Sequence, residues 1–276
     1  MEGGIGMKVT FLGGGNMGAA IVGGLVDRGF PAADITVIEP GAAARESLAA
    51  RFGVAVREAA GPGLPLAEAL VLAVKPQQMR QAVAPLVPLP ASTLVVTIAA
   101  GIRIADLSRW LGGHAAIVRA MPNTPALVHA GMTGLHAPPA VDAAGRGRAE
   151  TLLGAVGETV WLPREEDLDA VTAVSGSGPA YVFYFIEALE RAAVELGIAP
   201  GPARQLALAT FLGAAKLAKA RGEDPAVLRA QVTSKGGTTE RALGEMEAAG
   251  LKARFGEAVK AARERSRELG EEFGKD

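Results

Sequence analysis

The chain has 276 residues, 49% of them hydrophobic and 21% charged, which suits one large folded domain or two modest ones and excludes a disordered protein. Its 28 basic and 29 acidic residues give a net charge of −1, so no overall field draws the protein to nucleic acid or to an anionic membrane. Cysteine is absent, which excludes disulfides, thiolate metal ligands and cysteine nucleophiles and agrees with a cytoplasmic location.

A strand, a glycine-rich turn, a helix and a second strand follow one another near the start of the chain. The first six residues precede this pattern and are set aside as a tag or an upstream start. Residues 8–12 and 35–39 are rich in β-branched and aromatic side chains, and residues 19–28 between them have the apolar spacing of a helix. Such a series within about 30 residues is typical of the βαβ unit of a parallel sheet.

The turn after the first strand reads Gly-Gly-Gly-Asn-Met-Gly over residues 13–18, which fits the dinucleotide fingerprint. Gly13 permits the tight turn, Gly15 lets the backbone approach a pyrophosphate, and Gly18 lets the helix pack closely on the strand. The amides at the helix N-terminus attract the phosphates. An ordinary glycine-rich turn has the same letters, but the flanking strand, helix and acidic residue favour a cofactor site.

Glu39 is the acidic residue at the end of the second strand. Its carboxylate can accept hydrogen bonds from both hydroxyls of an adenosine ribose, and its charge repels a 2′-phosphate, which favours NADH. Alternatively, Glu39 is simply a solvated carboxylate beside the turn residue Pro40. Arg45 is close enough in sequence to weaken the repulsion between Glu39 and a 2′-phosphate.

Further strands are predicted at residues 69–74, 94–98, 116–118 and 159–161, all nearly continuous apolar runs of the kind found in sheets covered on both faces. We therefore expect an α/β domain with a doubly wound, Rossmann-type parallel sheet over residues 1–162, starting in practice at Met7. None of its apolar runs approaches the ~18–20 residues that span a bilayer, and no signal peptide opens the chain, so no membrane contact is expected.

After Pro163 helical spacing replaces the strand pattern, in segments 168–174, 181–196, 203–220, 226–232, 238–248 and 251–273. We expect an all-helical domain over residues 163–276. Two glycine-rich breaks interrupt it, at residues 175–179 and 234–239, and their backbone amides and hydroxyls suit a small carboxylate ligand. The second break is the better anion site because its amides begin a helix, although ordinary helix connections and caps use the same residues.

Six segments together resemble the pyrroline-5-carboxylate reductase family, over most of residues 7–270. They are residues 13–18, Ala-Val-Lys-Pro at 73–76, Ala-Ala-Gly at 99–101, Arg-Ala-Met-Pro-Asn-Thr-Pro-Ala at 119–126, Ser-Gly-Ser-Gly-Pro-Ala-Tyr at 175–181 and Gln-Val-Thr-Ser-Lys-Gly-Gly-Thr-Thr-Glu at 231–240. The last two are the most specific. The chain departs from the family pattern at Lys235, where proline is common, and at Glu39, where many relatives have a hydroxyl or basic residue and use NADPH.

The resemblance implies an oxidoreductase that reduces 1-pyrroline-5-carboxylate to L-proline, the last step of proline biosynthesis, by hydride transfer from NAD(P)H. It implies that Ser234, Gly237 and Thr238 bind the substrate carboxylate and that the Thr239 hydroxyl meets the ring nitrogen as the catalytic group. The cofactor-binding residues that it implies are Gly13, Gly15, Asn16, Met17, Gly18, Glu39, Ala73, Val74, Lys75, Pro76, Ala100 and Asn123. An iminium is already electrophilic, so positioning matters more than acid–base chemistry.

The family's helical domains interlock as dimers, sometimes as pentamers of dimers, so the resemblance implies a homodimer or a pentamer of dimers. The all-round apolar residues 181–186 agree with an interface, and a monomer core would also explain them. Two alternative functions are a different enzyme and a protein that is not an enzyme. A β-hydroxyacid dehydrogenase would need a lysine on the first interdomain helix, but none occurs between Lys75 and Lys216, and a nucleotide-binding sensor would not oxidise NADH.

His114, His129 and His136 have no spacing typical of a metal site. We expect them at surface or loop positions, and we predict no metal site.

Overall fold

The computed structural model describes residues 7–61 and 67–275, and the chain forms two compact units. The first unit contains residues up to Ser177 together with Ala262–Asp276, and the second is Gly178–Ala261. The six residues set aside in the sequence lie outside the described part. The chain therefore crosses from one unit to the other twice, after Ser177 and before Ala262.

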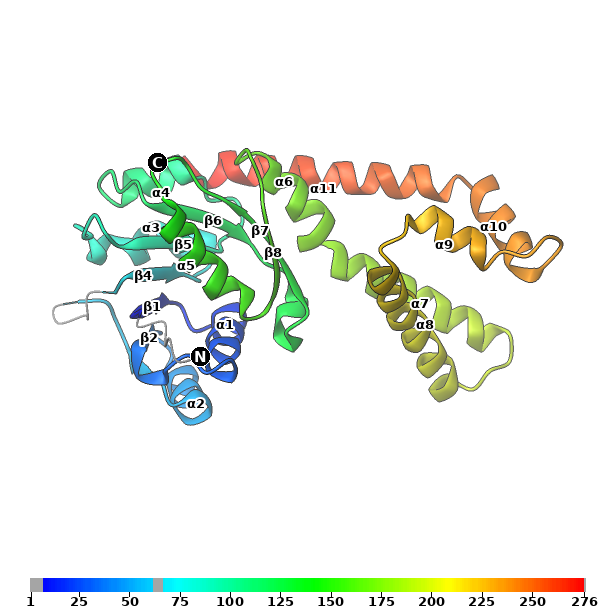
Figure 1. Ribbon diagram of the computed structural model, residues 1–276, viewed down its shortest axis with the longest axis horizontal. Helices are drawn as coiled ribbons and strands as arrows, with labels where there is room; N and C mark the ends of the chain where they lie inside the picture. The colour runs from blue at the N-terminus through cyan, green and yellow to red at the C-terminus, as the bar shows by residue number, and fades with distance from the viewer. Residues whose placement is uncertain (1–6, 62–66, 276) are drawn as a thin grey trace. The chain divides into compact units, whose positions relative to one another are not determined.

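The first unit is built on an eight-stranded sheet with the order β3-β2-β1-β4-β5-β6-β7-β8 (Figure 1). The strands are β1 Val9–Leu12, β2 Ile35–Ile38, β3 Ala55–Arg57, β4 Ala69–Leu72, β5 Leu94–Thr97, β6 Ile117–Met121, β7 Gly131–His136 and β8 Gly157–Trp161. Strands β1 to β6 pair in parallel, as the apolar runs predict. The order reverses beside β1, between β2 and β4, which is the place where open α/β sheets bind ligands.

Two strands were not predicted, and one of them changes the direction of the sheet. β3 has only three residues at the sheet edge, and none of them is buried. β7 contains two glycines, a threonine and a histidine, so it lacks an apolar strand pattern. It pairs antiparallel to β6 and parallel to β8. The expected parallel sheet thus ends at β6. β7 and β8 extend it as a parallel pair that runs in the opposite direction to the other strands.

Helices cover both faces of the sheet, which makes it doubly wound. They are α1 Asn16–Asp27, α2 Ala42–Phe52, α3 Met79–Val83, α4 Ile104–Trp110, α5 Ala143–Gly154 and α6 Asp167–Val171, with short turns η1 Ala32–Asp34, η2 Pro76–Gln78, η3 Ala84–Leu86, η4 Thr124–Val128 and the π-helical η5 Thr172–Gly176. Successive strand residues enter different cores: Phe11 and Val71 pack in one cluster, and Leu12 and Leu72 in the other. The strand pattern of the sequence gives way to helical spacing after Pro163, where the domain boundary was expected. The sheet unit instead continues to Ser177, because α6 packs against β6 and β7.

The second unit is helical, with α7 Gly178–Glu195, α8 Pro200–Arg221, α9 Pro225–Gln231, α10 Thr238–Ala248 and the first part of α11 Leu251–Phe273. These bounds match the predicted helices closely. α7 packs along α8, and the ring of Tyr181 meets the ring of Phe255 edge-on at 5.6 Å. Among residues 178–261, all of which the structure describes, only Ala203 and Ala207 are buried. This unit therefore has almost no core of its own within one chain.

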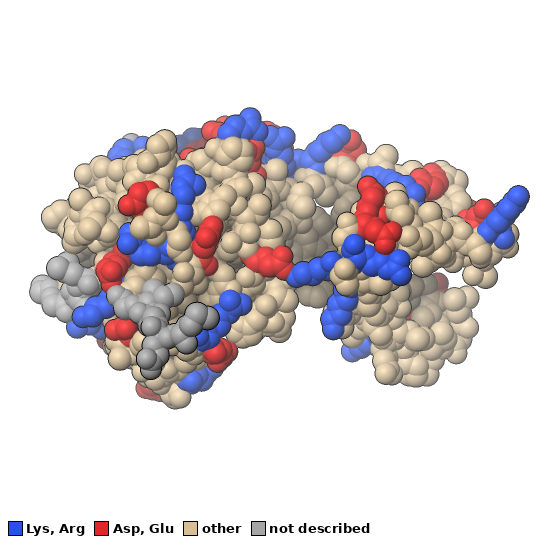
Figure 2. All heavy atoms as spheres, in the orientation of Figure 1, with Lys and Arg blue, Asp and Glu red and all other residues tan. Residues whose placement is uncertain are grey.

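Within the described ranges, no helix is long and apolar enough to span a membrane. Basic and acidic side chains are interspersed over the surface in view (Figure 2), as the near-neutral net charge predicts.

Candidate active site

The loop after β1 has the close packing that requires glycine at two positions. Gly13 has φ +105°, and a Cβ there would lie 2.7 Å from the carbonyl oxygen of Ala73. Its amide donates to the Ile38 carbonyl at 2.8 Å, which ties the loop to the end of β2. A Cβ on Gly18 would lie 2.5 Å from the carbonyl oxygen of Gly13, so the first turn of α1 presses directly on the loop. Neither clash can be relieved by moving a side chain, because backbone atoms cause both.

The middle of the same loop is open. Gly15 is exposed, and a Cβ there would meet nothing within 4 Å. It is the N-cap of α1, no side chain caps the helix, and no acidic residue stands in the first turn. The amides that begin α1 at Asn16 and Met17 therefore lack a side-chain acceptor, and an anionic group could supply one. These features fit the pyrophosphate of a dinucleotide.

Glu39 is fixed beside this loop by two backbone amides. Its Oε2 accepts from Gly14 N and its Oε1 from Gly41 N, both at 2.9 Å, and the side chain stays half-exposed. The Arg45 guanidinium donates to the backbone carbonyls of Glu39 and Pro40, at 2.8 and 2.7 Å, rather than to the carboxylate. Each carboxylate oxygen keeps a free lone pair, so Glu39 can still accept from ribose hydroxyls. The sequence showed Glu39 but not its bond to the glycine loop.

The segments that follow β4 and β5 lie at the same sheet edge as the glycine loop, because β4 pairs in parallel with β1 and β5 pairs in parallel with β4. A Cβ on either Gly13 or Gly18 would meet Ala73, at 2.7 Å from its carbonyl oxygen and at 3.3 Å from its Cβ. Val74 and Pro76 are half-buried and Lys75 is exposed, while Ala100 is half-buried after β5. The structure thus brings the predicted residues of these three loops together.

Asn123 follows β6 and is held by the protein itself. Its Oδ1 accepts from Met132 N at 2.9 Å, and its Nδ2 donates to the carbonyl and the hydroxyl of Ser175, both at 3.1 Å. We expected residues 175–179 to break the helix and leave amides unpaired. Instead the π-helical η5 carries the chain onward, and Ser177 N donates to the Thr172 carbonyl at 2.8 Å. The interruption is therefore shorter than expected: η5 ends at Gly176, Ser177 is a bend, and α7 begins at Gly178.

The second glycine-rich segment, in the helical unit, does form a loop before a helix. Gly236 has φ +73°, and its amide donates to Glu240 Oε2 at 2.6 Å. Gly237 is the N-cap of α10 without a side-chain cap, and a Cβ there would lie 2.5 Å from Ser234 Oγ. The Gly237 amide donates to the Ser234 carbonyl at 3.1 Å, whereas Thr238, as the first helical residue, has no intrahelical acceptor for its amide. The sequence did not reveal this hydrogen bond from the Gly236 amide to the Glu240 carboxylate.

Thr239 stands in the first turn of α10 and is half-buried, while Ser234 and Lys235 are exposed. Two hydroxyls and helix-initiating amides can bind a small carboxylate.

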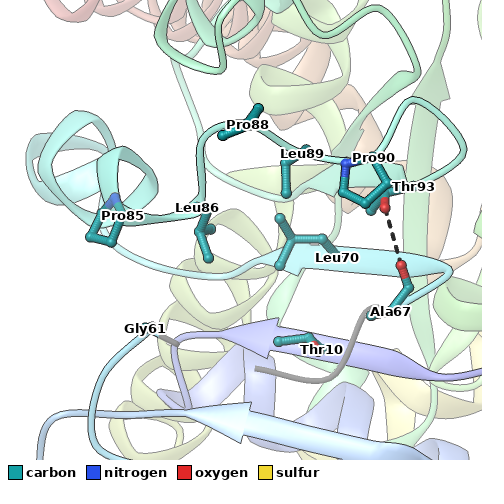
Figure 3. A pocket seen from close by; sticks show the side chains of 10 residues that line it. All are labelled: Thr10, Gly61, Ala67, Leu70, Pro85, Leu86, Pro88, Leu89, Pro90 and Thr93. Carbon is teal, nitrogen blue, oxygen red and sulfur yellow. Dashed lines mark hydrogen bonds between the residues drawn. The ribbon is translucent and has the colours of Figure 1, made fainter. Parts of the chain in front are cut away.

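A cavity of about 160 Å³ lies elsewhere in the sheet unit (Figure 3). Leu70, Leu86 and Leu89 line it, and Thr93 Oγ1 donates to the Ala67 carbonyl at its rim, at 3.2 Å. Ala67 and Thr93 precede β4 and β5, so the cavity is at the amino ends of these strands, opposite the glycine loop. It is separate from the candidate site.

The three histidines occupy different settings. His129 is exposed, His114 lies in a loop but is buried, and His136 is half-buried in β7 rather than at the expected surface or loop position. The Nε2 of His114 is 2.8 Å from the Thr93 carbonyl oxygen. In the part of the chain that the structure describes, no group of three His, Cys, Asp or Glu side chains could hold a metal ion.

Comparisons with known proteins match both units. A family described as pyrroline-5-carboxylate reductase dimerisation matches residues 165–269, and one described as NADP oxidoreductase coenzyme F420-dependent matches residues 8–101. The pyrroline-5-carboxylate reductase of Pseudomonas aeruginosa is 46% identical over 97% of this chain and 98% of its own length. That of Haemophilus influenzae is 42% identical over 95% and 97%.

Solved structures agree in fold. The pyrroline-5-carboxylate reductase of Coxiella burnetii has a TM-score of 0.90 at 38% identity, covering 95% of this chain and 98% of that one. The Plasmodium falciparum pyrroline carboxylate reductase, solved with NADP bound, has a TM-score of 0.85 at 28% identity, covering 97% and 100%.

Proposed function

The chain belongs to the pyrroline-5-carboxylate reductase family, and from that premise we infer how its two units share the reaction. It is an oxidoreductase that reduces 1-pyrroline-5-carboxylate to L-proline with NAD(P)H. The glycine loop of the sheet unit holds the cofactor, and the loop before α10 holds the substrate. The observation that carries the assignment is the 46% identity over 97% of the chain, which includes both loops.

The cofactor residues act mainly by holding and orienting. Gly15 and the amides of Asn16 and Met17 bind the pyrophosphate, and Glu39 accepts from the adenosine ribose. Its fixed negative charge supports a preference for NADH. Lys75 is exposed at the same sheet edge, which supports a role in attracting phosphate. When bound, the reduced nicotinamide supplies the hydride.

The substrate carboxylate is bound by the Ser234 hydroxyl and the Thr238 amide, and by the Gly237 amide once it gives up its bond to the Ser234 carbonyl at 3.1 Å. The Thr238 amide at the N-terminus of α10 has no side-chain cap, which supports this role, while the Glu240 carboxylate in the same turn accepts from the Gly236 amide. Glu240 holds Gly236 in its left-handed conformation and so keeps the loop in shape. Lys235 replaces the proline common in the family. Unlike proline, lysine does not restrict the backbone φ angle, so this residue does not stiffen the loop.

Thr239 is the proposed catalytic residue. In the first turn of α10, its hydroxyl hydrogen-bonds the ring nitrogen while the neighbouring groups hold the carboxylate. The iminium carbon is already electrophilic, so the protein has to bring the reacting carbons to ~3–3.5 Å and exclude water. A strong general acid is not required, and Thr239 stabilises the nitrogen as its charge changes.

The helical unit mediates assembly into a homodimer. Phe183 is 65% exposed, Tyr184 69% and Leu212 58% within one chain, and burying such apolar side chains favours association. The match of residues 165–269 to a dimerisation family supports the same conclusion. A pentamer of dimers is the larger assembly we propose to look for. A cytoplasmic location accords with the absence of cysteine.

A spectrophotometric assay tests the function. The purified protein should oxidise NADH or NADPH only when pyrroline-5-carboxylate is added, and proline should accumulate in equal amount. If the cofactor binds but the imine causes no oxidation, the assignment fails and a nucleotide-binding sensor takes its place.

A further inference from the structure

A largely buried group of charged and polar side chains lies in the sheet unit, around Asp169 of α6, with Arg103 and Glu165 half-buried at its margin. Asp169 is 4% exposed; its Oδ2 accepts from Arg103 Nη2 at 2.7 Å and its Oδ1 from Ser266 Oγ at 2.9 Å. Arg119 of β6 places Nη1 3.1 Å from Glu165 Oε1 and Nη2 4.0 Å from Asp169 Oδ1. We call these five residues the Asp169 cluster.

The Asp169 cluster joins the two places where the chain passes between units. Asp169 lies on α6, which leads through η5 to the crossing after Ser177. Ser266 lies on α11, which carries the chain back into the sheet unit at Ala262. One buried carboxylate therefore receives a hydrogen bond directly from the returning helix while standing on the departing one.

The same cluster reaches the sheet edge that holds the cofactor loops. Arg103 follows Gly101 in the segment after β5, and Ile104 N donates to Glu165 Oε1 at 2.8 Å. α11 packs on this segment: a Cβ on Gly270 would lie 2.9 Å from Arg103 Nε, and one on Gly101 would lie 2.8 Å from the Phe273 ring. α11 thus lies against the residues that follow Ala100.

The cluster withdraws two guanidinium groups and two carboxylates largely from water, which costs solvation free energy. Burial lowers the pKa of Arg119 below its ordinary value, and the nearby Glu165 carboxylate opposes that shift. Buried ion pairs add little net stability compared with apolar packing, but they fix the directions of their partners, because a charged group that turns away loses its hydrogen bond in a place that water does not reach. The arrangement is therefore better suited to setting geometry than to strengthening the fold.

We propose that the Asp169 cluster is a positioning device for the reduction, in which Ser266 and Arg103 hold the departing and returning helices in one arrangement with the cofactor edge. This inference rests on the proposed function. Arg103 stands in the segment after β5, beside the proposed cofactor residue Ala100, so the cluster fixes this segment and with it the orientation in which the cofactor is held for hydride transfer. Neither Ser266 nor Arg103 touches substrate in this scheme.

Two substitutions perturb the cluster without changing its charge. Ser266→Ala removes the hydrogen bond from α11, and Gly270→Ala pushes a methyl group against Arg103. Arg267→Ala is the matched control, because Arg267 is next to Ser266 on α11 but makes only exposed ion pairs with Glu264 and Glu271. For each protein we would measure kcat, KM for the imine, the NADH dissociation constant, Tm, and the deuterium isotope effect on kcat with 4-deuterated NADH.

The expected result is a kcat lowered by about tenfold in Ser266→Ala and Gly270→Ala, with a larger isotope effect because hydride transfer becomes rate-limiting, while the NADH dissociation constant stays within about twofold. Arg267→Ala should behave as the unmodified protein. A lower Tm with unchanged kcat and isotope effect would show a merely structural cluster and overturn the proposal.

Hydrogen exchange separates this proposal from the proposed function. In Ser266→Ala, amides of residues 167–177 and of residues 262–275 should exchange faster together, whether or not the imine is a substrate. Faster exchange of α11 alone would refute the link between the crossings. If the unmodified protein does not reduce the imine, both the proposed function and the positioning role in that reaction are refuted. The hydrogen-exchange result would still show whether the two crossings are linked.

Discussion

Glu39→Gln tests how one carboxylate both shapes the glycine loop and selects the cofactor. Both carboxylate oxygens accept a backbone amide at 2.9 Å, from Gly14 and Gly41. Glutamine has the same length but turns one acceptor oxygen into an NH₂ group, so one amide loses its acceptor. A lost hydrogen bond at a half-exposed charged group costs about 1–2 kcal/mol, which should lower Tm by roughly 2–8 °C in the absence of cofactor.

The effect on cofactor choice should be larger. The substitution weakens the acceptor for the ribose hydroxyls and removes the negative charge that opposes a 2′-phosphate, a change of about 1–3 kcal/mol in the difference between the two cofactors. The ratio of kcat/KM for NADPH to that for NADH should therefore rise about 5-fold to 150-fold. Glu39→Ser should shift the ratio in the same direction.

The assay is kcat/KM for each cofactor at saturating imine, followed by the loss of absorbance of the reduced nicotinamide. Glu46→Gln is the control, since it removes the same charge from an exposed position of α2 and should leave the ratio unchanged. An unmodified protein that already prefers NADPH by tenfold or more, or a Glu39→Gln protein with an unchanged ratio, would refute the reasoning and point to Arg45 as the deciding group.

Three further outcomes are expected. Thr239→Ala should lower kcat and kcat/KM together by the ~1–3 kcal/mol of one hydrogen bond, whereas Thr239→Ser keeps much of the activity and Ser234→Ala mainly raises KM; a lower Tm with normal kinetics would instead assign Thr239 to helix capping. Gly18→Ala should abolish detectable NADH binding by calorimetry, because its Cβ would lie 2.5 Å from the Gly13 carbonyl oxygen; micromolar binding would contradict the loop assignment. Phe183→Asp should shift sedimentation toward the monomer, and an unchanged assembly would place the interface elsewhere.

Much of the candidate site was predictable because its signals are local. The glycine positions at 13, 15 and 18, the acidic end of β2 and the start of α10 at Thr238 are short-range patterns of sterics and periodicity. The helices of the second unit were predicted nearly to their observed ends for the same reason. What those patterns could not give is which amides and hydroxyls are already engaged by the protein, as at Asn123 and Ser175.

The sequence by itself thus determined the type, order and approximate bounds of most elements, and it pointed to the residues that we propose to face a dinucleotide, since each depends on neighbours a few positions away. Only the tertiary structure decided the direction of β7, the π-helical path of η5 and the Asp169 cluster. Asp169 meets Arg103 and Ser266 across 66 and 97 positions of sequence, and no local pattern marks which buried charges will face one another. Their pairing follows from the packing of α6 and α11 on the sheet, because charges withdrawn from water must find partners wherever the fold brings them together.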